Sequence, residues 1–239
     1  RFLIEADGAL TFDPNGDCED LPIASNLVLH LESDQGVTEN GGSVTDWIDQ
    51  SSAGNDLSGA GDPQLVSAGT PSGKPALSLD GNGDKLERVN ANNPLNGLPT
   101  GSDDRSMFVV TKYENSPDFG GGVAYGSTNC GQTFGLIVHA DDLWLQGWCD
   151  DFGSDELGNG AGWLSQSVVY ESGQYTHFKN GTQIDQGSYS FNTQLSQLVV
   201  GAELDSDPFV DMEVAAVLVY DQALSESQRQ QVETYLQEK

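Results

Sequence analysis

Basic residues are scarce in this sequence. It has nine Lys and Arg against 37 Asp and Glu in 239 residues, which gives a formal net charge of -28. Nucleic-acid binding needs a basic surface that neutralises phosphates, and anionic membrane surfaces attract the same residues, so neither partner is expected. The many carboxylates favour two compatible interpretations: binding of divalent cations, and solubility in a salty exterior where ions screen self-repulsion.

Cysteines and long apolar runs are also few. Cys130 and Cys149 flank a pattern typical of two adjacent antiparallel strands, which predicts a disulfide and an oxidising compartment, whereas Cys18 has no evident partner. Zinc-ligand spacing is absent, and no apolar run approaches the length of a membrane span. Because the chain starts at Arg1 without a signal peptide, we expect a piece of a larger exported protein, outside the cell or at its surface.

Long amphipathic helical patterns are missing before Ser225. Val214–Tyr220 is a nearly continuous apolar run, which predicts a strand buried on both faces. Ser225 followed by Gln228 forms a capping-box pattern, and the helix behind it has one apolar stripe. The stripe consists of Leu224, Val232, Tyr235 and Leu236.

The rest of the chain has the pattern of strands joined by glycine-rich turns, which predicts an all-β fold of about a dozen strands and one terminal helix. Strands are expected at Asn26–Leu31, Pro75–Leu79, Ser106–Lys112, Gln132–His139, Leu143–Cys149, Ser165–Tyr170 and Gln174–Lys179. The glycine-rich segment Gly120–Gly126 is expected near the surface. No linker interrupts residues 26–239, so we predict one domain preceded by an N-terminal extension, residues 1–25.

Four segments in order resemble the blocks of bacterial laminin-G-like domains, which belong to the concanavalin A-like lectin/glucanase jelly rolls. They are NLVLHLESDQGVTENGGSVTDWIDQSSAGNDL, GKPALSLDGNGDKLE, GWLSQSVVYESGQYTHFKNGTQI and VAAVLVYDQALSESQRQQVETYL. The resemblance covers about residues 26–239. It implies a sandwich of two packed antiparallel sheets, often with a structural calcium ion, in exported proteins that bind glycans.

The glucanases of that superfamily place three acids on one strand in an E-x-D-x-x-E pattern, which suits a two-carboxylate mechanism. Glu203 and Asp205 begin such a pattern, but Pro208 occupies its third position. A G-x-S-x-G nucleophile elbow is also absent. We therefore predict that the domain is not an enzyme.

A ligand-binding surface is better supported. Along Leu143–Cys149 the two leucines alternate with Trp144, Gln146 and Trp148, so the latter three share a face. Sugar rings stack on flat aromatic side chains, and amides bind their hydroxyls. Tyr175 and His177 also share a face and are expected to complete the surface. In the alternative, these tryptophans lie in the core; Trp47 and Trp163 are expected to be packing residues.

An acidic turn, DGNGDKLE, carries Asp80 and Asp84 and suits a hard cation such as calcium. The resemblance supports Asp80, and Asp211 is the expected distant partner, since Ala216 stands where the family usually has an acidic residue. The alternative is a glycine hairpin with solvated acids. Asp13, Asn15 and Asp17 alternate in a similar way, but Cys18 occupies the usual glycine position, which favours an ordinary turn.

These observations predict a calcium-assisted, glycan-binding lectin domain of an exported adhesin or polysaccharide-processing protein. A structural or protein-interaction domain of a pilus or large adhesin is the alternative from a different class. A polysaccharide lyase or hydrolase is the third possibility, and it has the least support. The acidic loop with Asp150, Asp151, Asp155 and Glu156 lies next to Trp148 in sequence and favours neutral glycans, because it would repel acidic ones.

Overall fold

The structure, a computed structural model, describes residues 2–4, 10–12, 21–115, 120–205 and 207–239. Two short strands, β1 (Phe2–Ile4) and β2 (Leu10–Phe12), pair with each other as a separate antiparallel sheet. The acidic turn at 13–17 and Cys18 lie outside the described residues. All other strands belong to one large antiparallel network.

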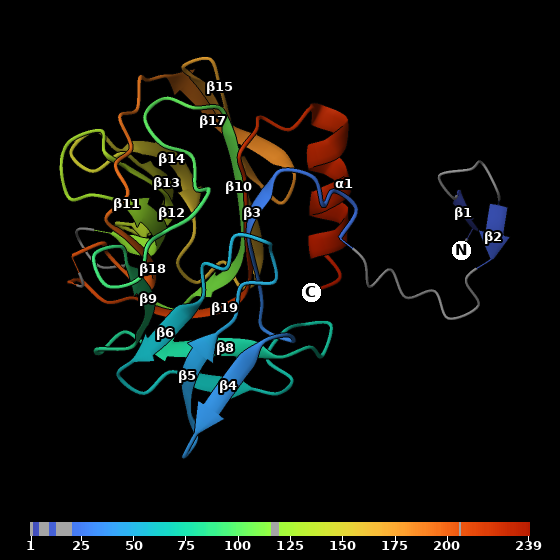
Figure 1. The fold of residues 1–239 in the computed structure, drawn as a ribbon, viewed down its shortest axis with the longest axis vertical. Helices are drawn as coiled ribbons and strands as arrows, with labels where there is room; N and C mark the ends of the chain where they lie inside the picture. Colours follow the sequence, from blue (N-terminus) through green and yellow to red (C-terminus); the bar gives the residue numbers. More distant parts are fainter. Residues whose placement is uncertain (1, 5–9, 13–20, 116–119, 206) are drawn as a thin grey trace.

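Two runs of paired strands make up this network (Figure 1). The first run, called here the β14 half, has the order β4 (Val37–Asn40), β5 (Ser43–Trp47), β6 (Leu57–Ala60), β9 (Lys85–Val89), β18 (Gln197–Ala202), β11 (Gly121–Gly126), β12 (Thr133–His139), β13 (Asp142–Gln146) and β14 (Phe152–Leu157).

The second run is called the β17 half. Its order is β17 (Thr182–Ser188), β16 (Gln174–Lys179), β15 (Leu164–Glu171), β10 (Arg105–Tyr113) and β19 (Asp211–Tyr220), followed by β3 (Leu27–Glu32) and β8 (Ala76–Asp80) along the two ends of β19, and then β7 (Gln64–Val66). A β5–β7 pairing joins the two halves at one edge. At the other edge, Phe152 of β14 contacts Tyr175 of β16, so the network nearly closes on itself.

The main core joins the two halves. Its side chains are the inward members of alternating strands, as expected for strands with one face on a core. Representative members from both halves are Leu29, Trp47, Met107, Leu136, Leu145, Val200 and Val217, all with no exposed surface. The expected packing role of Trp47 is confirmed, and its indole N–H donates to the backbone oxygen of Glu32 at 3.0 Å.

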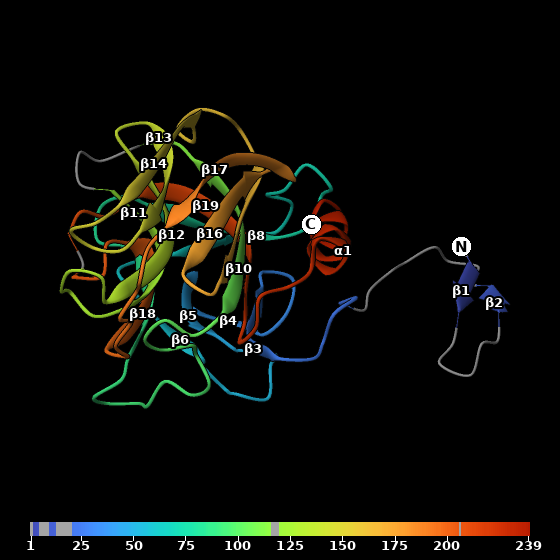
Figure 2. The same ribbon diagram turned by 90° about the horizontal axis from the view of Figure 1, so that it is seen from above.

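The C-terminal helix covers the outer face of the β17 half. Helix α1 (Glu226–Leu236) begins at Ser225, and the capping box with Gln228 is present as predicted. Its predicted apolar stripe packs against outward side chains of β10 and β19, including Phe108 and Leu218. Figures 1 and 2 both place α1 on the opposite side of the molecule from β11–β14. Strand β19 is therefore buried on both faces over Val214–Tyr220, as its composition predicts.

A buried carboxylate anchors the chain end beneath this helix. Glu32 of β3 has no exposed surface and accepts hydrogen bonds from Lys239 Nζ at 2.5 Å and from the Tyr235 hydroxyl at 2.6 Å. Its other partners are His30 Nε2 at 3.0 Å and Gln35 Nε2, which donates at 3.3 Å. Burial alone would raise the pKa of Glu32, but the bonds to His30, Lys239 and Tyr235 lower it to about 2.

Two expectations about the strands are wrong. The described residues contain strands up to β19, against the dozen expected, because several are short segments within the turn-rich stretch 37–66. The glycine-rich segment 120–126 forms β11, a fully buried strand between β12 and β18. A side chain at Gly122 would meet the Leu136 backbone oxygen at 2.8 Å, so glycine is needed there for close strand approach.

Candidate functional site

The alternation predicted for β13 is confirmed at its centre. Leu143 and Leu145 belong to the main core, so Trp144 and Gln146 lie on the opposite face. We call this surface the outer face: the face of β11, β12, β13 and β18 that is turned away from the main core. The strand ends at Gln146, earlier than predicted, and Trp148 lies in the loop that follows.

One row of paired residues runs across the four strands of the outer face, with glycine and alanine at its centre. Gln146 pairs with Gly135, Gly135 with Ala124, and Ala124 with Val199. Ala124 and Val199 nevertheless have no exposed surface, because they form a small cluster with Ala202 and Leu204 that is covered by Trp148 and Phe209. The segment after β18 therefore covers this part of the face, and the accessible part is at its rim.

Trp144 is half-buried and has close neighbours on its ring. His139 stacks on it with ring centroids 4.7 Å apart, and a side chain at Gly153 would lie 2.7 Å from the indole. The indole N–H of Trp144 is buried without a hydrogen-bond partner. A ring so enclosed is less available for stacking on a sugar than the sequence pattern predicts.

Trp148 has a backbone conformation that bulky residues rarely adopt. Its φ is +69°, in the left-handed region, where a non-glycine residue usually reflects a local constraint. Two interactions hold the loop: the predicted disulfide between Cys130 and Cys149, with Cα atoms 4.8 Å apart, and a 2.8 Å hydrogen bond from the Gly147 N–H to Asp151 Oδ1. Trp148, half-buried like Trp144, is thereby held at the rim of the outer face.

Two carboxyl groups with raised pKa values, those of Glu203 and Asp151, bond to the residues just before Trp148. Gln146 has no exposed surface, and its Nε2 donates to Glu203 Oε1 at 3.1 Å. Burial, followed by repulsion from Asp205 and Asp151, raises the pKa of Glu203 to about 7. Burial also raises the pKa of Asp151 to about 6, although the bond from Gly147 acts in the opposite direction.

Tyr175 and His177 are not on this surface, so the expected five-residue platform is not formed. On β16 the inward positions are Tyr175, a member of the main core, and His177, two residues later. The Tyr175 hydroxyl donates to Asp185 at 2.9 Å. His177 is fully buried, its Nε2 lies 2.9 Å from Gln166 Nε2, and burial lowers its pKa to about 3. Side chains of two strands form one outer surface only if both sets point away from the core. Trp144 and Gln146 do so, whereas Tyr175 and His177 point toward the core.

The predicted calcium ligands are only partly brought together. Asp80 and Asp211 are directly opposite in the β8–β19 pairing, and burial, with repulsion from Glu114 and Asp80, raises the pKa of Asp211. Asp84 is buried, and its two carboxylate oxygens accept backbone N–H groups of Asp62 at 2.5 Å and Asp80 at 3.3 Å. Asp84 thus holds the turn itself.

No group of three or more His, Cys, Asp or Glu side chains is arranged to hold a metal ion within the part of the chain that the structure describes. Sequence reasoning missed Glu203 and Asp151 as members of one surface. In the sequence, Glu203 stands only at the start of an incomplete catalytic triplet, and Asp151 stands in the acidic loop that follows Trp148. Their association depends on the segment after β18 folding over β13, and no short motif encodes that.

Sequence comparisons give no match: neither a protein-family profile nor a curated protein matches this chain. Solved structures do match. Domain 4 of AbnA, a GH43 extracellular arabinanase from Geobacillus stearothermophilus, solved in complex with arabinotriose, has a TM-score of 0.60 at 16% identity and covers 87% of this chain and 98% of that one. A Trypanosoma rangeli sialidase in complex with sialic acid has a TM-score of 0.64 at 13% identity.

A botulinum neurotoxin type C structure, whose cell entry is described as dependent on two ganglioside molecules, has a TM-score of 0.60 at 14% identity. This chain covers 52% of the toxin chain and 35% of the sialidase chain, so it corresponds to part of each. The shared feature is a fold. These neighbours are β-rich domains of carbohydrate-binding or carbohydrate-processing proteins. The described residues include no helix long and apolar enough for a membrane span.

Proposed function

We propose that this chain is an exported, non-catalytic glycan-binding domain of the laminin-G-like, concanavalin A-like jelly-roll type. The two runs of antiparallel strands around one core support this assignment, as do the neighbours among glycan-binding proteins. The disulfide between Cys130 and Cys149 supports an oxidising compartment.

The observation that carries the proposal is the constrained, half-buried Trp148 at the rim, in a loop with polar side chains. A sugar ring bound at the rim would stack on the indole, and Glu203 and Asp151 would bind its hydroxyls. Backbone strain at Trp148 is consistent with a side chain held in place for binding. This surface is smaller than the sequence predicts, because it lacks Tyr175 and His177 and because Trp144 is enclosed.

The absence of catalysis is part of the proposal and is tested directly. Hydrolysis by two carboxyl groups needs one that is ionised and one that is protonated across the scissile bond. Glu203, repelled by Asp205 and Asp151, and Asp151, repelled by Asp150, both have raised pKa values, whereas the proposed binding surface needs no defined pair of ionised and protonated acids. We expect no product from a panel of polysaccharides; release of new reducing ends by the wild type, lost in Glu203→Gln, would contradict the proposal.

A glycan array with the full chain tests the proposed surface. We expect Trp148→Ala to abolish binding and Trp144→Ala to weaken it less, because Trp144 is enclosed. Trp163→Ala is the matched control, since Trp163 is also half-buried but packs on the helix side of the molecule. Equal binding by wild type and Trp148→Ala would exclude the assigned surface.

Calcium is part of the same proposal, with Asp80 and Asp211 as the candidate oxygen ligands. The array is therefore run with calcium and with chelator. Glycan binding that is lost in chelator, and likewise lost in Asp80→Asn, would support a calcium requirement. If the folded wild type binds no glycan either with calcium or with chelator, the result would favour the alternative, a structural or protein-interaction domain.

A further inference from the structure

Aromatic side chains line the edge at which β14 of one half approaches β16 and β17 of the other. Phe152 packs against Tyr175 and Tyr189, with ring centroids 4.9 and 5.2 Å apart. Tyr189 in turn packs against Phe191 at 4.9 Å. Tyr175 and Phe191 are buried, whereas Phe152 and Tyr189 are half-buried and carry the accessible surface of this cluster. We call these two residues the edge aromatic pair.

Tyr189 is held in one orientation by hydrogen bonds at three points. Its backbone N–H donates to the Gly173 oxygen at 2.9 Å, and its backbone oxygen accepts from the Tyr170 hydroxyl at 2.9 Å. Its own hydroxyl donates to Asp150 Oδ2 at 2.8 Å. A side chain at Gly131 would lie 2.7 Å from this hydroxyl, so the glycine leaves room for it. A ring fixed in this way loses little further freedom when a ligand binds.

The acid that holds Tyr189 is accessible to a ligand. Asp150 is exposed, and its hydrogen bond within the described part of the chain uses Oδ2. Its Oδ1 can therefore accept a bond from a sugar hydroxyl, because an ionised carboxylate has sites for several donors. Neutral sugars bring such donors together with apolar ring faces, whereas acidic sugars would be repelled by Asp150 and Asp151. The edge aromatic pair and Asp150 together suit a neutral sugar.

This cluster lies next to Trp148 along one short loop. Trp148 and Asp150 are two residues apart, so their Cα atoms are at most about 7 Å apart. The residue between them is Cys149, which the disulfide fixes. Phe152 follows two residues later, at the start of β14. A glycan that leaves Trp148 along this loop therefore meets Asp150 and the edge aromatic pair within a few sugar units.

We infer that the glycan site extends from Trp148 past Asp150 to Phe152 and Tyr189, and that it takes a chain of neutral sugars rather than a single sugar. One ring stacks on Trp148, the following unit donates a hydroxyl to Asp150, and a further ring stacks on the edge aromatic pair. The inference rests on the proposed glycan-binding function and adds the length of the ligand to it. It also gives the Tyr189–Asp150 bond a role, because this bond positions both a ring and an acid.

The test measures how affinity depends on the length of the ligand. An array of neutral oligomers from one to six units, including those of glucose, xylose, mannose and N-acetylglucosamine, is probed with the full chain, and each series that binds is titrated by calorimetry. We expect affinity to rise at least about tenfold from the disaccharide to the hexasaccharide, a gain of about 1.4 kcal/mol. Equal affinity from the disaccharide upward overturns the inference, and so does binding confined to acidic glycans.

Three variants separate the edge aromatic pair from Trp148. Asp150→Asn keeps the shape of the side chain and removes its charge, Tyr189→Phe keeps the ring and removes the hydroxyl, and Phe152→Leu keeps an apolar side chain and removes the ring. We expect each to weaken hexasaccharide binding by about 2- to 10-fold, with little effect on the disaccharide. Asp150→Asn changes an exposed side chain, so it decides the test even if a ring variant fails to fold. Unchanged length dependence in the folded variants overturns the inference.

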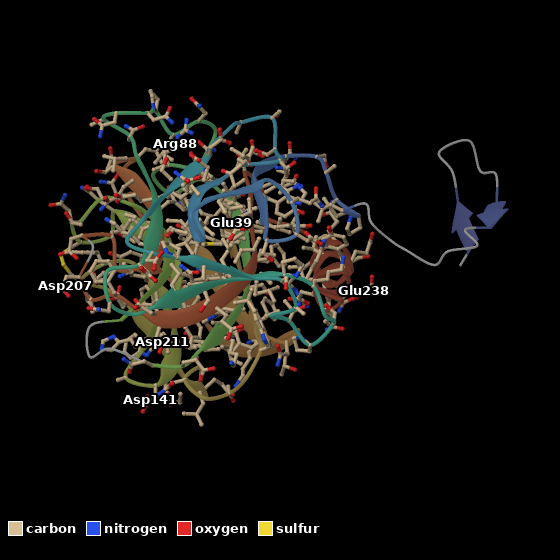
Figure 3. The ribbon with its side chains drawn as sticks, turned by 90° about the horizontal axis from the view of Figure 1, so that it is seen from below. Glu39, Arg88, Asp141, Asp207, Asp211 and Glu238 are labelled. Carbon is tan, nitrogen blue, oxygen red and sulfur yellow. A yellow bond between two sulfur atoms is a disulfide. The ribbon has the colours of Figure 1, made fainter. Side chains whose placement is uncertain are left out.

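Two changes on the helix side of the molecule are the matched controls. Glu238→Gln removes an exposed charge next to helix α1, where Figure 3 labels it. Tyr220→Phe removes a hydroxyl that donates to the Ile23 backbone oxygen at 2.9 Å. We expect neither to alter the length dependence. An equal loss in Glu238→Gln and Asp150→Asn would show a general effect of net charge and would overturn the inference.

The possible failures are distinguishable. Binding that depends on Trp148 but not on the length of the ligand would leave the proposed function intact and overturn only this inference. Absence of binding to every oligomer and to the glycan array would remove the proposed function itself, and this inference with it.

Discussion

A buried glutamate, Glu32, and a half-buried one, Glu203, respond to their surroundings in opposite directions. Glu32, beneath helix α1, has a built-in cation in Lys239, and its pKa is lowered to about 2. Glu203, at the rim of the outer face, has carboxylate neighbours and an amide, and its pKa is raised to about 7. Burial raises the pKa of both groups, so the opposite sign of the net shift comes from their partners.

We interpret the opposite pKa shifts as the difference between a glutamate with a structural role, Glu32, and a glutamate at the proposed binding surface, Glu203. The protein itself satisfies Glu32, whose carboxylate has four side-chain hydrogen-bond partners and needs no ligand. Glu203, by contrast, accepts a hydrogen bond from Gln146 and is repelled by Asp205, Asp151 and Asp207. Strongly perturbed carboxyl groups without a structural explanation are candidates for binding sites. The predictions below test this contrast, beginning with the largest expected effect.

Removing Glu32 should be the most damaging change. Glu32→Ala leaves the buried ammonium group of Lys239 with only the more distant Asp34 Oδ2, at 3.4 Å, and breaking a buried pair costs about 3–5 kcal/mol of unfolding free energy. Urea denaturation followed by fluorescence measures it. Lys74→Ala, which removes a partly exposed pair with Asp34, is the control, with an expected loss below about 1 kcal/mol. Similar losses in both variants would contradict the structural role of Glu32.

The same residue should govern stability in acid. The pKa of Glu32 is lowered from 4.5 to about 2, so its contribution is complete above pH 4.5 and is lost as pH falls towards 2. We expect the thermal midpoint of the wild type to fall across this range, with a smaller fall in Glu32→Gln. Scanning calorimetry at several pH values measures it, and identical slopes for the two proteins would contradict the assignment.

The disulfide should matter for the loop that carries Trp148. It closes a loop of 19 residues between Cys130 and Cys149, and loops of about this size stabilise by roughly 3 kcal/mol. We expect the double variant Cys130→Ser, Cys149→Ser to lose about that much and to bind glycan more weakly, because the rim loop is less fixed. Unchanged glycan affinity in a less stable protein would show that the loop needs no disulfide for binding.

Glu203 should show the opposite sign to Glu32. Its folded pKa is above its ordinary value, so its protonated form stabilises the fold below pH 4.5, and that contribution is lost as pH rises through about 7. We expect Glu203→Gln to raise the thermal midpoint by a few degrees at pH 8 and to have little effect at pH 4. A lower midpoint at pH 8 would mean that Glu203 stabilises the native structure, contrary to the contrast drawn here.

The sequence by itself determined the elements that depend on local pattern. Ser225 and Gln228 encode the start of the helix, because capping uses neighbouring backbone groups. Leu143 and Leu145 predict the inward face of β13, because side chains alternate along any strand. The Cys130–Cys149 bond also followed from the spacing of two adjacent strands. The burial of β11 was missed, because glycines give no apolar signal even where close strand approach requires them.

Only the tertiary structure decided which surfaces meet. The alternation of β16 is as regular as that of β13, but its phase directs His177 inward, and phase between distant strands depends on the packing of the whole network. Glu203 reaches Gln146, 57 residues away, because the segment after β18 folds over the outer face. Glu32 and Lys239 are even further apart in sequence. Which partners surround a carboxylate is a long-range property, and here it distinguishes the anchor of the helix from the candidate site.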